Sequence, residues 1–149
     1  MMRRLNCAVI MVAALAASAC DEKLSDVAGP TPNLQPTFSS IQREIFNARD
    51  SSGRAACTEC HNAVGREFAA GMSLAQGVAY SELVNRASRD NPGAIRVIPG
   101  DPERSYLIHK LEGRPTIVGE RMPRGVGPYL TPGQISVIRR WIELGALND

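Results

Sequence analysis

The run Cys57-Thr58-Glu59-Cys60-His61 constrains this chain more than any other stretch of its sequence. Two cysteines separated by two residues and followed at once by a histidine form the C-x-x-C-H pattern of covalent haem attachment. The two thiols add across the two vinyl groups of the porphyrin, and the adjacent histidine binds the iron as the proximal axial ligand. The sequence therefore predicts one covalently bound haem c, held by Cys57 and Cys60, with His61 on the iron.

The N-terminus has the pattern of an export signal. Arg3 and Arg4 precede an uncharged, mostly apolar stretch over residues 7–19, which is shorter than the roughly 20 apolar residues that span a bilayer. The stretch closes on Ala17-Ser18-Ala19-Cys20, which resembles a bacterial lipobox. We expect residues 1–19 to be a lipoprotein-type signal peptide and Cys20 to carry lipid. The alternative is an ordinary signal cut at the same Ala-x-Ala, which leaves a soluble exported protein.

The export signal predicts where the mature chain is located. We expect an exported protein on the periplasmic side, anchored by lipid to a membrane, and Asp21 after the lipidated cysteine favours the inner membrane. The cysteines are then all assigned, because Cys7 leaves with the signal, Cys20 carries lipid, and the other two of the four carry haem. No cysteine is left for a disulfide, so the cofactor is expected to supply the covalent staple.

The charge balance bears on partners. The full chain has a net charge of +2, but without Arg3 and Arg4 it holds 15 basic and 15 acidic residues. Neither a basic stripe nor a set of stacking aromatics is present, so nucleic acid is not an expected partner. We expect redox partner proteins in the periplasm or membrane instead.

The mature chain divides into a tether and one domain. Residues 20–36 contain three prolines and a glycine and show no periodic apolar pattern, so we expect a lipidated cysteine followed by a flexible tether. Residues 37–149 are expected to form an all-α domain, because strand signals are almost absent. Helices are predicted from Ser39, with Gln42 in capping-box spacing; over 74–85, with Val78 in the core; from Asp101 to Gly113; and from Thr131, capped with Gln134, to Gly145.

Beyond the C-x-x-C-H run, five further motifs follow one another along the chain: Val97-Ile98-Pro99-Gly100-Asp101-Pro102, Ser105-Tyr106-Leu107, Lys110-Leu111-Glu112-Gly113, Arg121-Met122-Pro123 and Trp141-Ile142-Glu143-Leu144-Gly145-Ala146. From about Phe38 to Ala146 the chain resembles a bacterial family of exported monohaem c-type cytochrome domains with the class I cytochrome c fold. The resemblance implies about four to five helices around one haem, and it implies that Met122 is the distal iron ligand.

The local sequence supports Met122 in that role. It lies in a Gly/Pro-rich loop over residues 119–128, where proline stiffening can present a thioether to iron. Met72 lacks such a loop. His109 is the competitor that would give a bis-histidine haem, but a helical wheel places it opposite the apolar face of Leu107, Ile108 and Leu111, toward solvent. The residue whose carbonyl orients the His61 imidazole, which metal-bound histidines require, is not identifiable from the sequence.

These features predict one-electron transfer with His61/Met122 ligation and no catalysis by side chains. Two alternatives remain. If Met122 is labile, peroxide or a gas could bind the iron, and the protein would be a haem enzyme or sensor. If no haem is attached, Cys57, Cys60 and His61 could form a zinc or thiol-redox site, although the only other histidine is His109 and the strand–helix context of thioredoxin-like motifs is missing.

Overall fold

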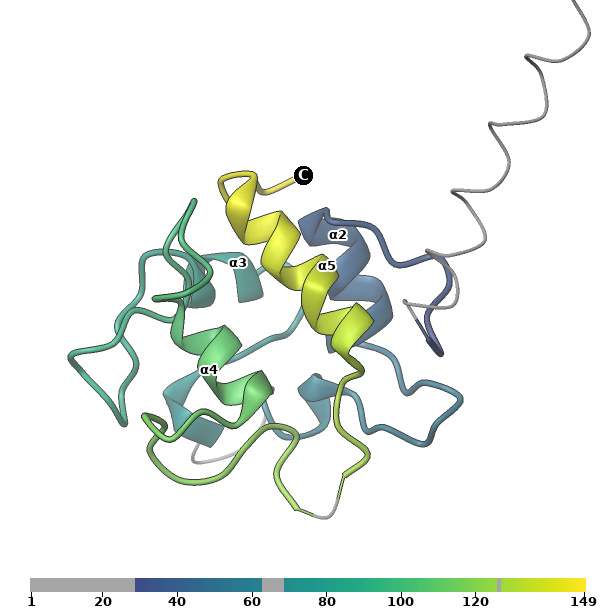
Figure 1. Cartoon of the computed structure of the whole chain (residues 1–149), viewed down its shortest axis with the longest axis horizontal. Coiled ribbons are helices and arrows are strands. Elements are labelled where there is room, and N and C mark those ends of the chain that lie inside the picture. Colours follow the sequence, from purple (N-terminus) through teal and green to yellow (C-terminus); the bar gives the residue numbers. More distant parts are fainter. Residues whose placement is uncertain (1–28, 63–68, 126) are drawn as a thin grey trace, which may run out of the picture.

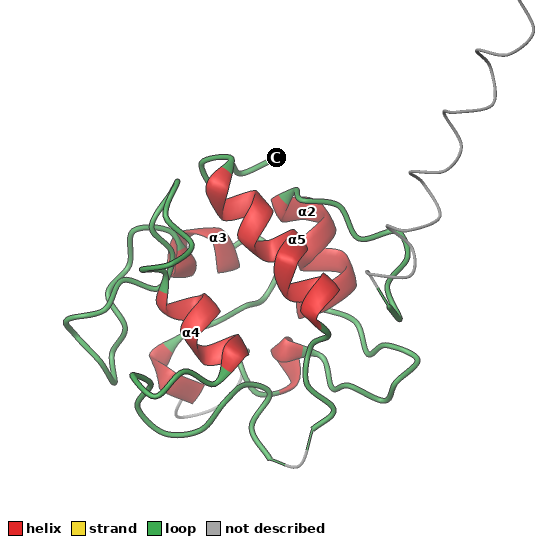
Figure 2. Cartoon of the chain, in the orientation of Figure 1, coloured by secondary structure: helices red, strands yellow, loops and turns green. Residues whose placement is uncertain are grey.

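The computed structural model describes residues 29–62, 69–125 and 127–149. Its regular elements are helical (Figures 1 and 2): α2 (Phe38–Ile41), the π-helical turn η1 (Gln42–Phe46), the 3-10 turns η2 (Cys57–Glu59) and η3 (Ala69–Gly71), α3 (Ala79–Leu83), α4 (Tyr106–Glu112) and α5 (Pro132–Glu143). Within these ranges, β-pairing is limited to three isolated bridges. The expectation of a helical domain is confirmed for the described part of the chain.

The core is built around the packing of α5 on the first helix, which lie next to each other in Figure 1. The rings of Phe38 and Trp141 are 5.5 Å apart between centroids, and Trp141 is 1% exposed. The prediction that Trp141 is a core residue of the last helix is confirmed. Buried side chains from each of α2, α3, α4 and α5 join the same cluster, among them Ile41, Leu83, Ile108, Ile138 and Ile142.

Helix α5 forms as its sequence predicts. The Thr131 hydroxyl accepts a hydrogen bond from the Gln134 N–H at 3.2 Å, and the Gln134 carbonyl oxygen Oε1 accepts one from the Thr131 N–H at 2.9 Å. Pro132 occupies the first helical position, where its missing N–H costs no hydrogen bond. After the last turn, Gly145 takes a φ of 101°, which ends the helix.

Helix α4 begins later than predicted, at Tyr106 rather than just after Asp101. The Asp101 carboxylate does accept a backbone N–H, that of Arg104 at 3.0 Å, but it closes a turn instead of a helix. The fully buried Ser105 hydroxyl then donates to the Asp101 carbonyl at 2.7 Å and accepts from the Ile98 N–H at 2.9 Å. The Asp101 carbonyl is thus bonded to a side-chain hydroxyl, whereas in a helix that began just after Asp101 it would accept a backbone N–H. The predicted stop at Gly113, with φ of 73°, is confirmed.

The helix predicted over 74–85 is only five residues long, Ala79–Leu83. Gly77 takes a φ of 87°, which breaks the helix before it starts. At the other end, Val84 is extended and pairs with Val97. Val78, predicted to be a core residue, is 42% exposed, whereas Leu83 is buried at 1%.

The first helix is capped by Thr37, not by Ser39. The Thr37 hydroxyl accepts the Ser40 N–H at 3.3 Å, so the helix begins at Phe38. The Gln42 side chain does not close a capping box but donates to the Leu74 carbonyl at 2.8 Å and to the Asn47 side chain. Upstream, residues 29–36 lie against the domain: Leu34 belongs to the core cluster and Thr31 is 4% exposed.

Candidate haem-attachment site

The motif cysteines and histidine lie on one tight turn. Cys57–Glu59 form the 3-10 turn η2, and the Cys57 carbonyl accepts the N–H groups of Cys60 at 3.3 Å and His61 at 2.9 Å. The Glu59 carboxylate folds back to accept the Ala56 N–H at 2.8 Å. Local hydrogen bonds therefore fold the cysteine motif into one tight turn.

The turn is docked on the C-terminal end of the first helix. The Thr58 hydroxyl donates to the Phe46 carbonyl at 3.0 Å, and the Cys57 thiol donates to the Ile45 carbonyl at 3.6 Å. Both carbonyls belong to η1, the π-helical turn that ends this helix. Wider π-turns recur at functional sites, and here the turn directs its last carbonyls toward the cysteine motif.

The two thiols differ in environment. Both are unpaired, but Cys60 is exposed, whereas Cys57 is partly buried and packs against the core. Burial raises the pKa of the Cys57 thiol to about 11, although the nearby Arg54 charge opposes the shift. The thiol is therefore neutral at pH 7. Redox-active C-x-x-C motifs do the opposite and lower the pKa of their nucleophilic cysteine.

His61 is held in one orientation. The side chain is buried, at 8% exposure, and its Nδ1 lies 3.0 Å from the Ala69 carbonyl oxygen. Because a carbonyl can only accept, Nδ1 carries the proton and Nε2 keeps a lone pair. Burial lowers the pKa of His61, so the ring is neutral at pH 7. A neutral imidazole with Nδ1 bound to a carbonyl and a free Nε2 lone pair is the form that binds a metal.

The Ala69 carbonyl is the functional group that the sequence could not identify. This acceptor of the His61 hydrogen bond is a backbone oxygen, so the residue type at position 69 gives no sign of it in the sequence. The acceptor lies eight positions after His61 in the sequence, at the start of the turn η3 (Ala69–Gly71). The same oxygen also accepts the Met72 N–H at 3.3 Å, which fixes its direction.

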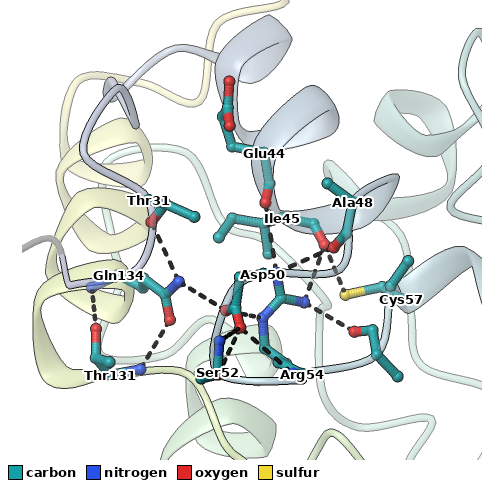
Figure 3. Close-up of polar contacts among 12 residues, drawn as sticks. Thr31, Glu44, Ile45, Ala48, Asp50, Ser52, Arg54, Cys57, Thr131 and Gln134 are labelled. Atoms are coloured by element: carbon teal, nitrogen blue, oxygen red, sulfur yellow. Dashed lines mark hydrogen bonds and ion pairs between the residues drawn. The ribbon is translucent and has the colours of Figure 1, made fainter.

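A buried ion pair lies directly before the motif (Figure 3). The side chains of Arg54 and Asp50 are 0% and 2% exposed, and Arg54 Nε is 3.0 Å from the Asp50 carboxylate. The remaining four guanidinium N–H groups face backbone carbonyls, those of Glu44, Ile45, Ala48 and Ala55, at 2.9–3.4 Å. Two of these carbonyls, those of Glu44 and Ile45, belong to the last turn of the helix, where carbonyls lack intrahelical partners.

This ion pair joins three segments of the chain. The Ile45 carbonyl accepts both Arg54 Nη1 and the Cys57 thiol. From α5, the Gln134 amide donates to Asp50 at 3.3 Å and to the Thr31 hydroxyl at 3.1 Å. Figure 3 shows the resulting chain of contacts from α5 through the ion pair to Cys57.

Met122 lies on a separate loop. Its N–H donates to the Lys110 carbonyl of α4 at 2.9 Å, and its partly buried side chain packs against the same core cluster as Cys57 and Met72. The Lys110 ammonium donates to the Val118 carbonyl at 2.9 Å, which closes the start of the loop onto the helix. The loop is therefore anchored to α4 on both sides of its first turn.

His109 is engaged elsewhere. Its Nε2 lies 2.6 Å from the Glu103 carbonyl and its Nδ1 lies 3.2 Å from the Thr116 hydroxyl. Both ring nitrogens of His109 are therefore in contact with groups of the segments that flank α4. Among residues 29–62, 69–125 and 127–149, no group of three or more His, Cys, Asp or Glu side chains is placed to hold a metal ion.

The predicted signal peptide and the lipidation site Cys20 lie outside the described residues, as does most of the predicted tether. In the part of the chain that the structure describes, no helix has the length and apolar character needed to cross a membrane. The comparisons with known proteins return no match: no family model, no curated protein and no solved structure is similar enough to this chain to be reported.

The residues of the turn fit a covalently bound haem. Two cysteines without a disulfide, separated by two residues, directly precede a buried histidine whose Nδ1 is hydrogen-bonded to a backbone carbonyl. This is the donor set that c-type attachment uses. The fit rests on the geometry of His61 as well as on the motif.

Proposed function

We propose that this protein is an exported c-type cytochrome that transfers single electrons. Cys57 and Cys60 would hold one haem, and His61 and Met122 would bind its iron. The observation that carries the proposal is the hydrogen bond from His61 Nδ1 to the Ala69 carbonyl of η3, because His61 directly follows two cysteines that form no disulfide. The helical core with α5 packed on the first helix supports a class I cytochrome c-like fold.

In this proposal the haem supplies the one-electron couple, and the chain supplies attachment, orientation and burial. The thiols of Cys57 and Cys60 would hold the porphyrin on the turn, and the Ala69 carbonyl would fix the orientation of the His61 imidazole as the proximal ligand. The burial of His61 would limit the access of water to this ligand.

Met122 suits the distal position because its loop is anchored. A Met/His ligand pair raises the reduction potential and fills both axial positions, which is what an electron carrier needs. The bond from the Met122 N–H to the Lys110 carbonyl would hold the thioether side chain near one place in both oxidation states. His109 does not compete for this role, because both of its nitrogens contact other groups.

The thiol-redox alternative is less well supported. A thiol-exchange site needs a cysteine that ionises near neutral pH, and burial raises the pKa of Cys57 to about 11. The same neutral, partly buried thiol is compatible with attachment to a porphyrin during maturation. A zinc site would need a fourth ligand, and both ring nitrogens of His109 contact other groups.

The proposal includes the location of the protein. With a signal over residues 1–19 and lipid on Cys20, the domain would work at the periplasmic face of a membrane, with the inner membrane favoured by Asp21. Confinement to that surface raises its effective concentration for membrane-bound electron donors and acceptors. No side-chain catalysis is proposed.

The first test is an absorption spectrum of the full chain, produced together with a c-type cytochrome maturation system. We expect covalently bound haem, a low-spin spectrum in both oxidation states, and a ferric sulfur-to-iron charge-transfer band. Met122→Ala should abolish that band and keep the haem attached, whereas Met72→Ala should leave the band unchanged and serves as the matched control.

Three other results would contradict the proposal. A low-spin ferric spectrum without the sulfur band would indicate bis-histidine ligation. A high-spin spectrum, or carbon monoxide binding to the reduced wild type at pH 7, would indicate an enzyme or sensor with an open iron. Failure of Cys57 and Cys60 to bind haem under these conditions would return the motif to zinc or thiol chemistry.

A further inference from the structure

The turn η3, whose Ala69 carbonyl accepts the His61 Nδ1–H, is itself in a strained conformation. Ala70 takes a φ of 54° and Gly71 a φ of 58°, two successive residues in the left-handed region. This region is unfavourable for a residue with a side chain and persists only where the surroundings enforce it. Ala70 directly follows Ala69, whose carbonyl binds His61. The direction of that carbonyl therefore depends on what enforces the turn.

Arg96 provides one such restraint, in addition to the bond from the Met72 N–H to the Ala69 carbonyl. The side chain is 9% exposed, and its Nη2 faces the carbonyls of Ala70 and Gly71, each at 3.4 Å. Its other terminal nitrogen, Nη1, donates to Glu82 twice, to the carbonyl at 2.7 Å and to the carboxylate at 3.1 Å. One guanidinium thus bridges the C-terminal end of α3 and the turn η3.

The chemistry of this bridge requires an arginine. A planar guanidinium presents donors on two sides in a fixed fork, whereas a lysine ammonium is a single point charge on a flexible stem. Lys at position 96 would keep the positive charge and the pairing with Glu82 but would release the two carbonyls of η3. The substitution therefore separates the effect of the bridge from the effect of the charge.

We infer that Arg96 is a positioning residue for His61: by holding the carbonyls of Ala70 and Gly71 it fixes the Ala69 carbonyl that accepts the His61 Nδ1–H. The inference rests on the proposed role of His61 as the proximal haem ligand. A firm hydrogen bond at Nδ1 makes the imidazole a stronger donor, and a stronger donor stabilises ferric over ferrous iron. Through the turn, Arg96 thus lowers the reduction potential. Its positive charge by itself would raise the reduction potential, and Arg96→Lys keeps that charge.

The test compares Arg96→Lys with wild type in the haem-loaded full chain. At a fixed ambient potential, Arg96→Lys should raise the ratio of ferrous to ferric protein roughly three- to tenfold, where tenfold corresponds to about 59 mV for one electron. In the ferrous state, the His61 Nδ1–H should exchange faster with deuterium by NMR. Arg86→Lys is the matched control, because Arg86 is exposed and should change neither quantity.

The outcomes separate this inference from the proposed function. An unchanged ratio together with unchanged exchange in Arg96→Lys would overturn the role of Arg96, even if the wild-type spectrum shows Met/His ligation. If Arg96→Lys does not fold, Glu82→Gln weakens the same bridge and should shift both quantities in the same direction by less. If wild type binds no haem, the proposed function fails at that step. Nitrogen-15 NMR of the haem-free chain then compares the His61 tautomer in wild type and Arg96→Lys, and an unchanged tautomer would overturn the role of Arg96.

Discussion

At the scale of single residues, Arg54 is the most constrained side chain of the structure near the cysteine motif. It is fully buried, and the donors on all three of its nitrogens face the Asp50 carboxylate or backbone carbonyls. A buried charge is tolerated only when it is paired and hydrogen-bonded. Arg54 satisfies that condition through five different groups, so the loss of its one counter-charge should be costly.

We therefore expect Asp50→Asn to lower the free energy of unfolding by about 3–5 kcal/mol at pH 7, the usual effect of leaving one charge of a buried pair uncompensated. Urea unfolding followed by circular dichroism would measure it. Glu143→Gln is the control, because the pair of Arg140 and Glu143 is exposed and exposed pairs contribute about 0–1 kcal/mol. A loss of less than 1 kcal/mol in Asp50→Asn would contradict the role given to the pair.

The same pair determines part of the response to acid. Burial alone raises the pKa of Asp50, but hydrogen bonds from Ser52, Gln134 and Arg54, with the Arg54 charge, bring it below its ordinary value. A carboxyl whose pKa is depressed in the folded state stabilises the fold above its unfolded pKa, about 3.9, and loses that contribution as pH falls through the folded pKa. The stability difference between wild type and Asp50→Asn should therefore be constant above about pH 5 and narrow below about pH 4.

At the scale of elements, the sequence predicts best where the determinants are local. Helix α5 carries its own cap, its proline and its apolar stripe within one segment, and it forms as expected. Helix α4 starts late because the Ser105 hydroxyl closes a loop back to Ile98, and α3 ends early because Val84 pairs with Val97. These two interactions join residues that are 7 and 13 positions apart, and the apolar periodicity of a single helix contains no sign of them.

The cap of α5 is directly testable. Thr131→Ala removes the hydroxyl that accepts the Gln134 N–H and should lower the free energy of unfolding by about 1 kcal/mol, within a range of about 0.5–2. Ser136→Ala is the control, because Ser136 is an exposed residue inside the same helix, where alanine is the better helix former. If both substitutions had the same effect on the urea midpoint, the cap would not be a source of stability.

At the scale of the whole molecule, the candidate site joins local and distant parts of the chain. Cys57, Cys60 and His61 could be predicted because one short motif contains them. The Ala69 carbonyl and Arg96 could not, because a backbone acceptor has no residue signature and Arg96 acts from 35 positions beyond the histidine. Met122 stays a prediction from the motif and its loop.

The N-terminal boundary of the packed domain is a second property of the whole molecule. Leu34 is 4% exposed and belongs to the core cluster, although the sequence assigned it to the tether. Leu34→Ala should therefore lower the free energy of unfolding by about 2–5 kcal/mol, as for other buried leucines. Leu147, which is 58% exposed, provides the control, and Leu147→Ala should change it by less than about 0.5 kcal/mol. Equal effects of the two substitutions would place Leu34 outside the core.

The bond between His61 and the Ala69 carbonyl has a consequence for protein engineering. Because the acceptor belongs to the main chain, no substitution at position 69 removes it, and alanine there is partly exposed. A library of side chains at this one position would vary the polarity and bulk beside the imidazole while the contact itself persists. Position 69 would then serve as a graded control of the electron affinity of the proposed haem, separate from its attachment.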